Sequence, residues 1–140
     1  LHPRVRRQRQ MCIRDSLMVV KSKEGLEKVG KAANIYQAPA AIVVCADKTK
    51  AWKRPFDGKI TTDIDASILT DHMMLEATEL GLGSVWICYF KPDILKEELN
   101  LPENLEPVNI LALGYSDELD ASAKRHKDMR IGMDELVSYL

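Results

Sequence analysis

The segment DASILTDHMMLEATELGLGSVWICYF, residues 65–90, contains a long amphipathic pattern, a glycine turn and a short apolar run. Apolar residues recur at intervals of three and four, which predicts a helix from Asp63 to Leu80. One apolar stripe consists of Ala66, Leu69, Met73, Ala77 and Leu80. A second stripe, about 160° away around the helix, consists of Ile64, Ile68 and Leu75. We expect the sheet to cover one stripe and a further helix or a second subunit to cover the other.

Gly81 follows this helix where a left-handed residue is expected, and Ser84 to Tyr89 is predicted as a strand. The Gly81-Leu82-Gly83-Ser84 sequence resembles half of a dinucleotide-binding fingerprint. That fingerprint follows a strand and opens a helix, whereas these glycines close a helix, so we disfavour a Rossmann domain. His72 and Glu76, one turn apart, are a metal-ligand spacing, but no third ligand is near, which favours a solvated pair.

The flanking sequence predicts further elements of one domain. They are a strand at Leu17 to Lys21, a helix capped by Ser22 and ending near Tyr36, a central strand at Ala40 to Ala46, a helix from Pro92 to Leu99, a buried strand at Val108 to Tyr115 and a helical turn at Asp134 to Tyr139. Asp47 to Thr62 is a long loop containing Trp52, Arg54 and Phe56. It is either a packed surface loop or a flap over a substrate pocket.

Leu1 to Ser16 differs from the rest of the chain: it holds five arginines and one acid without apolar periodicity. A basic arm that binds nucleic acid is one interpretation. We favour another, because Met11 to Ser16 (MCIRDS) resembles the translation of a transposase adapter used to prepare sequencing libraries. We therefore treat residues 1–16 as an artefact that packs against nothing, and residues 17–140 as the domain.

Charge, hydropathy and cysteine content limit the function of that domain. It has 15 basic and 20 acidic residues, a net charge of about −5, which argues against a nucleic-acid partner. No apolar run approaches the length of a membrane-spanning helix, so we expect no membrane partner. Cys45 and Cys88 lie in apolar runs without a CxxC or metal-ligand spacing, which favours a reducing compartment, the cytoplasm.

Residues 65–90 resemble the core helix, Gly-Leu-Gly-Ser turn and following strand of the FMN-dependent nitroreductase family. Other matches follow in the same order: Ala38-Pro39 before an apolar strand, Leu113 to Tyr115 closing the last strand, then Arg125, His126 and Arg130 before Glu135 to Val137. The resemblance covers Leu17 to the end of the chain. It implies an α+β fold with a mixed central sheet flanked by helices, normally an intertwined homodimer with FMN at the interface.

The resemblance also implies a cofactor site. Trp86, Ile87, Cys88 and Tyr89 match the strand that lies along the flavin, much of the contact being through backbone N–H groups. Arg130 matches the arginine that pairs with the FMN phosphate. Some members have a second basic residue where this chain has Asp128, so Lys127 or His126 would substitute. No catalytic side chain and no metal is implied, because the flavin carries the chemistry.

The implied activity passes electrons from NAD(P)H through FMN to a nitroaromatic, a quinone or a similar small-molecule acceptor. A flavin-modifying or dehalogenating relative on the same fold, or a non-catalytic domain without cofactor, are the alternatives. The family's arginine-rich phosphate-binding segment should precede Leu17, where the adapter-like sequence stands. We therefore expect a truncated chain that binds FMN weakly or not at all.

Overall fold

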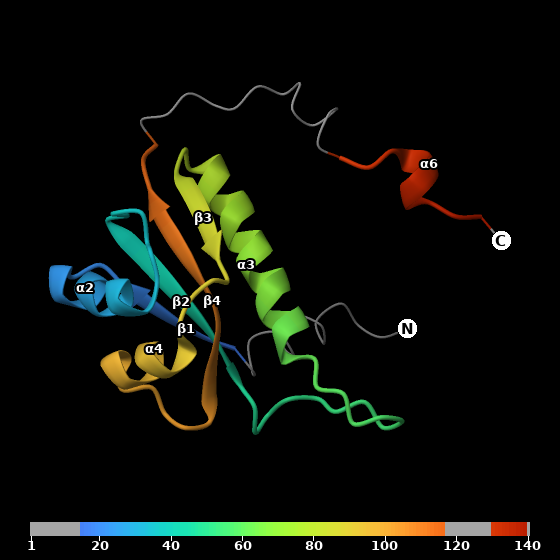
Figure 1. The fold of residues 1–140 in the computed structure, drawn as a ribbon, viewed down its shortest axis with the longest axis horizontal. Helices are drawn as coiled ribbons and strands as arrows, with labels where there is room; N and C mark the ends of the chain where they lie inside the picture. The colour runs from blue at the N-terminus through green and yellow to red at the C-terminus, as the bar shows by residue number, and fades with distance from the viewer. Residues whose placement is uncertain (1–14, 117–129, 140) are drawn as a thin grey trace.

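The computed structural model describes residues 15–116 and 130–139. Residues 15–116 form one sheet with helices on both faces (Figure 1). The strands are β1 (Asp15–Val20), β2 (Ala40–Asp47), β3 (Gly83–Ile87) and β4 (Leu105–Gly114). The helices are α2 (Lys23–Ala32), α3 (Thr62–Glu79), α4 (Pro92–Leu99) and α6 (Met133–Leu136). The α+β class is thus as predicted.

The sheet has the strand order β1-β2-β4-β3, and each of its three pairings is antiparallel. The prediction of a mixed sheet is therefore not met by the described strands. β2 and β3 do run in the same direction, with α3 as the crossover between them. However, β4 lies between these two strands and is antiparallel to both, so no parallel pair forms hydrogen bonds.

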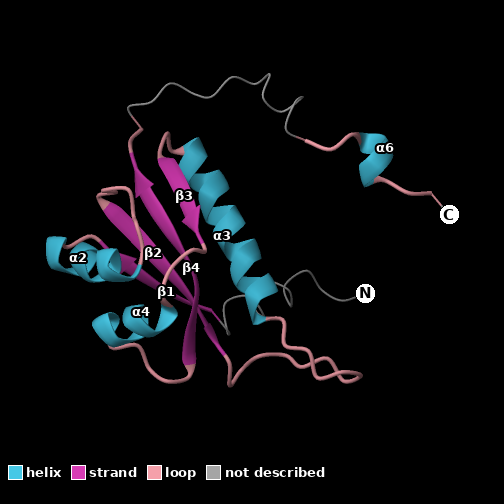
Figure 2. Cartoon of the chain, in the orientation of Figure 1, coloured by secondary structure: helices cyan, strands magenta, loops and turns pink. Residues whose placement is uncertain are grey.

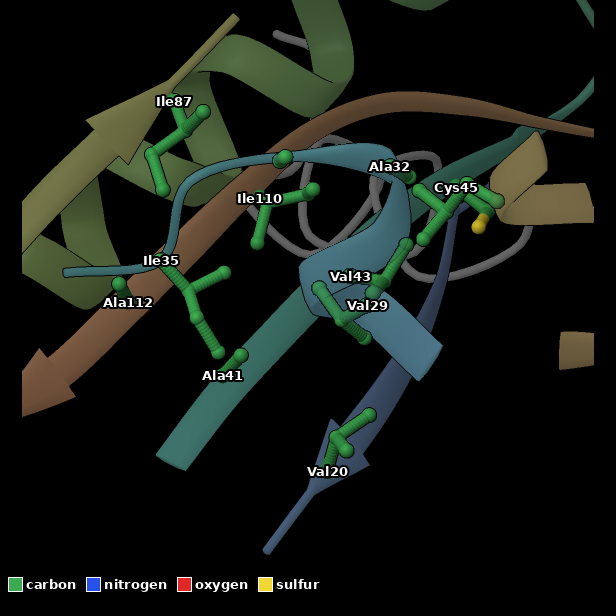
Figure 3. Packing of buried hydrophobic residues seen from close by; sticks show 12 residues of the cluster. Val20, Val29, Ala32, Ile35, Ala41, Val43, Cys45, Ile87, Ile110 and Ala112 are labelled. Carbon is green, nitrogen blue, oxygen red and sulfur yellow. The ribbon is translucent and has the colours of Figure 1, made fainter. Parts of the chain in front are cut away.

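Helices cover the two faces unequally (Figure 2). α2 and α4 pack against each other on one face, where the core is centred on Val29, Leu95, Val43 and Ile110, all without solvent exposure. Figure 3 shows Val29 beside Val43, and Ile87 beside Ile110, on this face. α3 crosses the other face and contacts all four strands, most closely β2 and β4.

Local sequence explains where two helices begin and end. Ser22 caps α2 as predicted, because its Oγ accepts a hydrogen bond from Gly25 N–H at 3.1 Å. Gly81 has the expected left-handed φ of 72° after α3. There, Leu82 N–H donates to the Ala77 carbonyl at 2.8 Å and Gly81 N–H to the Thr78 carbonyl at 3.0 Å, the paired bonds of a glycine C-cap.

Two predicted boundaries are corrected. α2 ends at Ala32 rather than near Tyr36, because Ala33 already has an extended backbone with φ −147° and ψ 153°. Tyr36 and Gln37, farther along, adopt left-handed φ values of 55° and 57°. β1 begins at Asp15, two residues before the predicted start of the domain, with Asp15 opposite Ala46 and Ser16 opposite Cys45. Main-chain pairing with β2 needs no apolar side chains, so the sequence pattern missed it. Residues 1–14 lie outside the described part of the chain.

The loop after β2 is a narrow hairpin whose base is held by Asp47. The Thr49 hydroxyl donates to Asp47 Oδ1 at 2.6 Å and lowers the pKa of that carboxyl to about 2. Farther out, Lys53 bridges to Ile60 and Arg54 forms an ion pair with Asp57. Phe56 is exposed at 95% and its ring does not pack against the described chain, whereas Trp52 is exposed at 46% and is partly covered. The flap over a substrate pocket stays a prediction.

Candidate functional site

The predicted cofactor strand ends at an open part of the sheet edge. β3 pairs with β4 as far as Ile87, opposite Ile110, and the next two residues lie beyond the ladder. Cys88 is exposed, and the side chain of Tyr89 is exposed at 97%. Main-chain N–H groups beyond the last pair of a ladder are available to a ligand.

Trp86 and Ile87 point to opposite faces of β3, because side chains alternate along a strand. Ile87 is buried in the core on the α2 side (Figure 3), which leaves its main chain as the part that could contact a cofactor. Trp86 lies opposite Leu111 on the α3 face and is half-buried. Its indole Nε1 is buried and has no hydrogen-bond partner among the described residues. Such an orphaned donor is a candidate contact for a ligand acceptor.

Of the predicted phosphate ligands, the structure describes Arg130, which is not brought to β3 within one chain. Arg130 is exposed and begins the C-terminal segment, residues 130–139. Figure 1 shows α6, in that segment, standing apart from the sheet. Its apolar side chains Ile131, Met133 and Leu136 are exposed. Lys127 lies outside the described residues.

The outer side of α3 carries apolar side chains that the rest of the described chain leaves exposed. Ile64, Ile68 and Leu75 are exposed by 41–63%, while Ala66 and Ala77 of the other stripe are buried. The prediction of one covered and one uncovered stripe is confirmed for these five residues. Leu17 and Val19 of β1, on the same face of the sheet, are also exposed. Exposed apolar side chains on one face are typical of protein surfaces that bind a partner.

The sequence profile of the Nitroreductase family matches residues 4–115. This range covers most of the chain and includes the whole described sheet. The chain belongs to the nitroreductase family. The match begins inside the segment that we set aside as an artefact, and that assignment stays a prediction.

Individual nitroreductase-family proteins resemble the chain in sequence and in fold. A nitroreductase family protein from Clostridium difficile 630 has a crystal structure that is 51% identical and superposes with a TM-score of 0.87, covering 98% of this chain and 86% of that one. An FMN-dependent nitroreductase from Clostridium difficile R20291 is 25% identical with a TM-score of 0.63, covering 91% and 84%.

A protein of Archaeoglobus fulgidus provisionally named NADH dehydrogenase/NAD(P)H nitroreductase is 38% identical over 112 residues, 74% of this chain. The chain spans 62% of the length of that relative, and 54% of a similarly named protein of Methanothermobacter thermautotrophicus.

The sequence analysis of this nitroreductase-family chain did not predict a buried polar pair, Thr70 and Asn109, between α3 and β4. Thr70 Oγ1 lies 2.8 Å from the Ala66 carbonyl and 3.0 Å from Asn109 Oδ1, and both side chains are fully buried. A hydroxyl has one proton, so it cannot donate to both oxygens. Turning the Asn109 amide would let Nδ2, otherwise without a partner among the described residues, donate to Thr70. Asn109, a polar residue within the apolar run of β4, was the sequence feature that could have indicated this pair.

Among the described residues, no group of three His, Cys, Asp or Glu side chains is placed to hold a metal ion, and the His72 and Glu76 pair gains no third ligand. No helix in the same part of the chain is long and apolar enough to cross a membrane.

The two described cysteines of this nitroreductase-family chain should differ sharply in reactivity. Burial raises the pKa of the Cys45 thiol to about 11, and the nearby Glu106 carboxylate adds to the rise. Since reactive thiolate appears only as pH approaches the raised pKa, on the order of 1 in 3,000 Cys45 thiols is ionised at pH 7.5. We expect iodoacetamide at that pH to alkylate exposed Cys88 at least about 100-fold faster than Cys45. Peptide mass spectrometry measures both rates, and unfolding in urea should equalise them. Equal rates in the folded protein would contradict the buried position of Cys45.

Proposed function

We propose that the protein is an FMN-dependent oxidoreductase that passes electrons from NAD(P)H to a small-molecule acceptor such as a nitroaromatic or a quinone. Family membership supports oxidoreductase chemistry. The names of an FMN-dependent neighbour and of the NAD(P)H nitroreductase relatives support the cofactor and the donor. The observation that carries the proposal is at the end of β3. There the buried indole Nε1 of Trp86 has no hydrogen-bond partner among the described residues, and the chain runs on past the last pair of the strand with β4.

The residues at this end suit the ring of a flavin. The main-chain N–H groups of Cys88 and Tyr89 and the indole N–H of Trp86 are donors, and a flavin ring presents carbonyl and ring-nitrogen acceptors along its edge. When bound, FMN supplies the electron-transfer chemistry. Fixed N–H donors would orient the ring and stabilise negative charge that develops on it, without having to reorganise. The exposed side chain of Tyr89 would border the acceptor's side of the site.

We propose further that the site is completed in a homodimer. A phosphate needs a cationic partner, and Arg130 lies on a segment that stands apart from its own sheet. The uncovered apolar stripe of α3 and the exposed apolar side chains of residues 130–139 are two surfaces that a second copy would bury. Two unpaired described cysteines support the cytoplasm as the compartment.

FMN titration tests this proposal. Replacing Arg130 with alanine removes a charge-assisted contact worth about 1.5–3 kcal/mol, so FMN affinity should fall by roughly 10- to 150-fold. Trp86→Phe removes the indole N–H and keeps an aromatic ring, so affinity should fall by about 2- to 12-fold. Arg54→Ala is the matched control, because Arg54 is an exposed arginine already paired with Asp57. Quenching of flavin fluorescence measures each dissociation constant.

A second measurement locates the site independently of activity. FMN bound at the end of β3 should slow alkylation of Cys88 in proportion to occupancy, while alkylation of the Cys88 peptide in the unfolded chain should not respond to FMN. Saturable FMN binding without protection of Cys88 would place the cofactor elsewhere. Absence of FMN binding at millimolar concentration would contradict the proposed site at the end of β3 in this chain.

A further inference from the structure

A hollow of about 680 Å³ lies at the opposite end of β3 from Cys88. It is formed where the turn after α2 meets the beginning of β3 and the end of β4. Its lining includes Tyr36 and Gln37 from the turn, Ser84 and Val85 from β3, and Tyr115 just after β4. Val85 of the lining is followed directly by Trp86 of the proposed flavin site, but successive side chains of a strand point to opposite faces of the sheet.

The turn that forms one wall is held firmly in an unusual conformation. Tyr36 and Gln37 are consecutive non-glycine residues with left-handed φ values of 55° and 57°, which is unfavourable for a large side chain such as tyrosine. Asn34 Oδ1 accepts a hydrogen bond from Tyr36 N–H at 2.9 Å, and Ala38 N–H donates to the Ile35 carbonyl at 3.0 Å. Strained backbone persists where its surroundings fix it, and it is concentrated at ligand sites.

Two packing contacts attach this turn to the sheet. Ile35 is buried in the core, and Figure 3 shows it reaching toward Ala41 of β2. On β4, a Cβ atom added to Gly114 would lie only 2.9 Å from Pro39 Cδ, so glycine allows the proline ring to rest on the strand. The wall that carries Tyr36 is therefore preformed rather than loose.

The chemistry of the lining indicates what the hollow would hold. Tyr36 and Tyr115 are exposed by 64% and 81%, and Val85 of the same lining is also exposed. None of the described residues that line the hollow is charged. The polar side-chain groups are the Gln37 amide, the Ser84 and Ser116 hydroxyls and the two phenols. Aromatic surface with a few neutral hydrogen-bonding groups, in a volume of this size, is typical of a small-molecule site.

We propose that this hollow binds an uncharged, planar aromatic molecule of one or two rings, held against Tyr36 and Tyr115. The rings supply stacking or edge contacts, and Gln37 or Ser84 supplies one hydrogen bond to a polar substituent. Trp86, Cys88 and Tyr89, the proposed flavin contacts at the end of β3, do not line the hollow, so its occupancy can be tested without the cofactor.

Indole is a suitable probe, because it is planar, uncharged and small enough for the hollow. With ¹⁵N-labelled protein, titration with indole should give saturable shifts confined to the amides of Gly83, Ser84, Gly114 and Tyr115. Tyr36→Gly removes the ring and also relieves the left-handed strain, so the variant should fold at least as well as the parent. Its affinity for indole should fall by about three- to tenfold, as should that of Tyr115→Ala.

Matched variants separate ring contact from general effects. Tyr36→Phe and Tyr115→Phe keep the rings and should bind indole within about twofold of the parent. Phe56→Ala removes an aromatic ring that is 95% exposed in the loop after β2 and should change nothing. Unchanged affinity in Tyr36→Gly and Tyr115→Ala would overturn the proposal. So would shifts at these amides that follow protein concentration without indole, since a second copy would then fill the hollow.

Discussion

Replacing Leu95 with alanine is expected to lower the free energy of unfolding by about 2–5 kcal/mol. Leu95 is the fully buried residue of α4, and it packs in the cluster that joins α2, α4 and the sheet. Truncation removes buried apolar surface and leaves a cavity that the antiparallel sheet cannot readily close. Because a domain of this size is stable by only about 5–15 kcal/mol, this loss is a large fraction of its total stability.

Urea unfolding followed by circular dichroism gives both the midpoint and its slope. Leu80→Ala is the matched control: it removes the same atoms from a leucine that is 64% exposed at the end of α3. The control should lie within about 0.5 kcal/mol of the parent. Similar losses in the two variants would show that α4 does not pack on the sheet as described.

The sequence predicted α3 well because its signal is repeated along 18 residues. Two apolar stripes on opposite sides of one helix cannot both be covered by one sheet, so the uncovered stripe followed from geometry. Leu80 is the exception. It was assigned to the covered stripe, but it caps the end of the helix and is exposed. Helical periodicity indicates to which side of the helix a residue points. It does not indicate whether the sheet extends far enough to cover that residue.

Boundaries that depend on the main chain were harder to predict. The early start of β1 and the antiparallel pairings rest on backbone hydrogen bonds, which side-chain patterns do not record. α2 ends early because Ala33, a good helix former, is extended. The turn that follows contains left-handed Tyr36 and Gln37, residue types that give no turn signal of their own.

The candidate site, too, was predicted only in part from the sequence. Family resemblance placed four consecutive residues at the cofactor, but strand alternation sends Ile87 into the core and Trp86 toward α3. Cys88 and Tyr89 follow the last strand pair and are accessible. Arg130 is distant along the chain, and a single copy does not bring it to them. A site proposed to be shared between subunits cannot be assembled from one chain's sequence pattern.

The double variant Ile68→Lys with Leu75→Lys is expected to convert the proposed dimer into a monomer. Both side chains lie on the exposed stripe of α3. Burying each apolar side chain is worth about 1.5–3 kcal/mol, and a lysine there would also place charge in the interface. The dissociation constant of the dimer should therefore rise by roughly two to four orders of magnitude.

Sedimentation velocity over a range of protein concentrations measures this change. Glu76→Lys, in the polar sector of the same helix, is the control and should leave the dimer intact. If the FMN site requires Arg130 from a second copy, FMN affinity should fall in the double variant in step with dimer dissociation, and raising protein concentration should restore it. A double variant that stays dimeric would show that another surface forms the interface. A monomeric variant with full FMN affinity would show that one chain supplies the whole site, because in a monomer no second copy is present to contribute its Arg130.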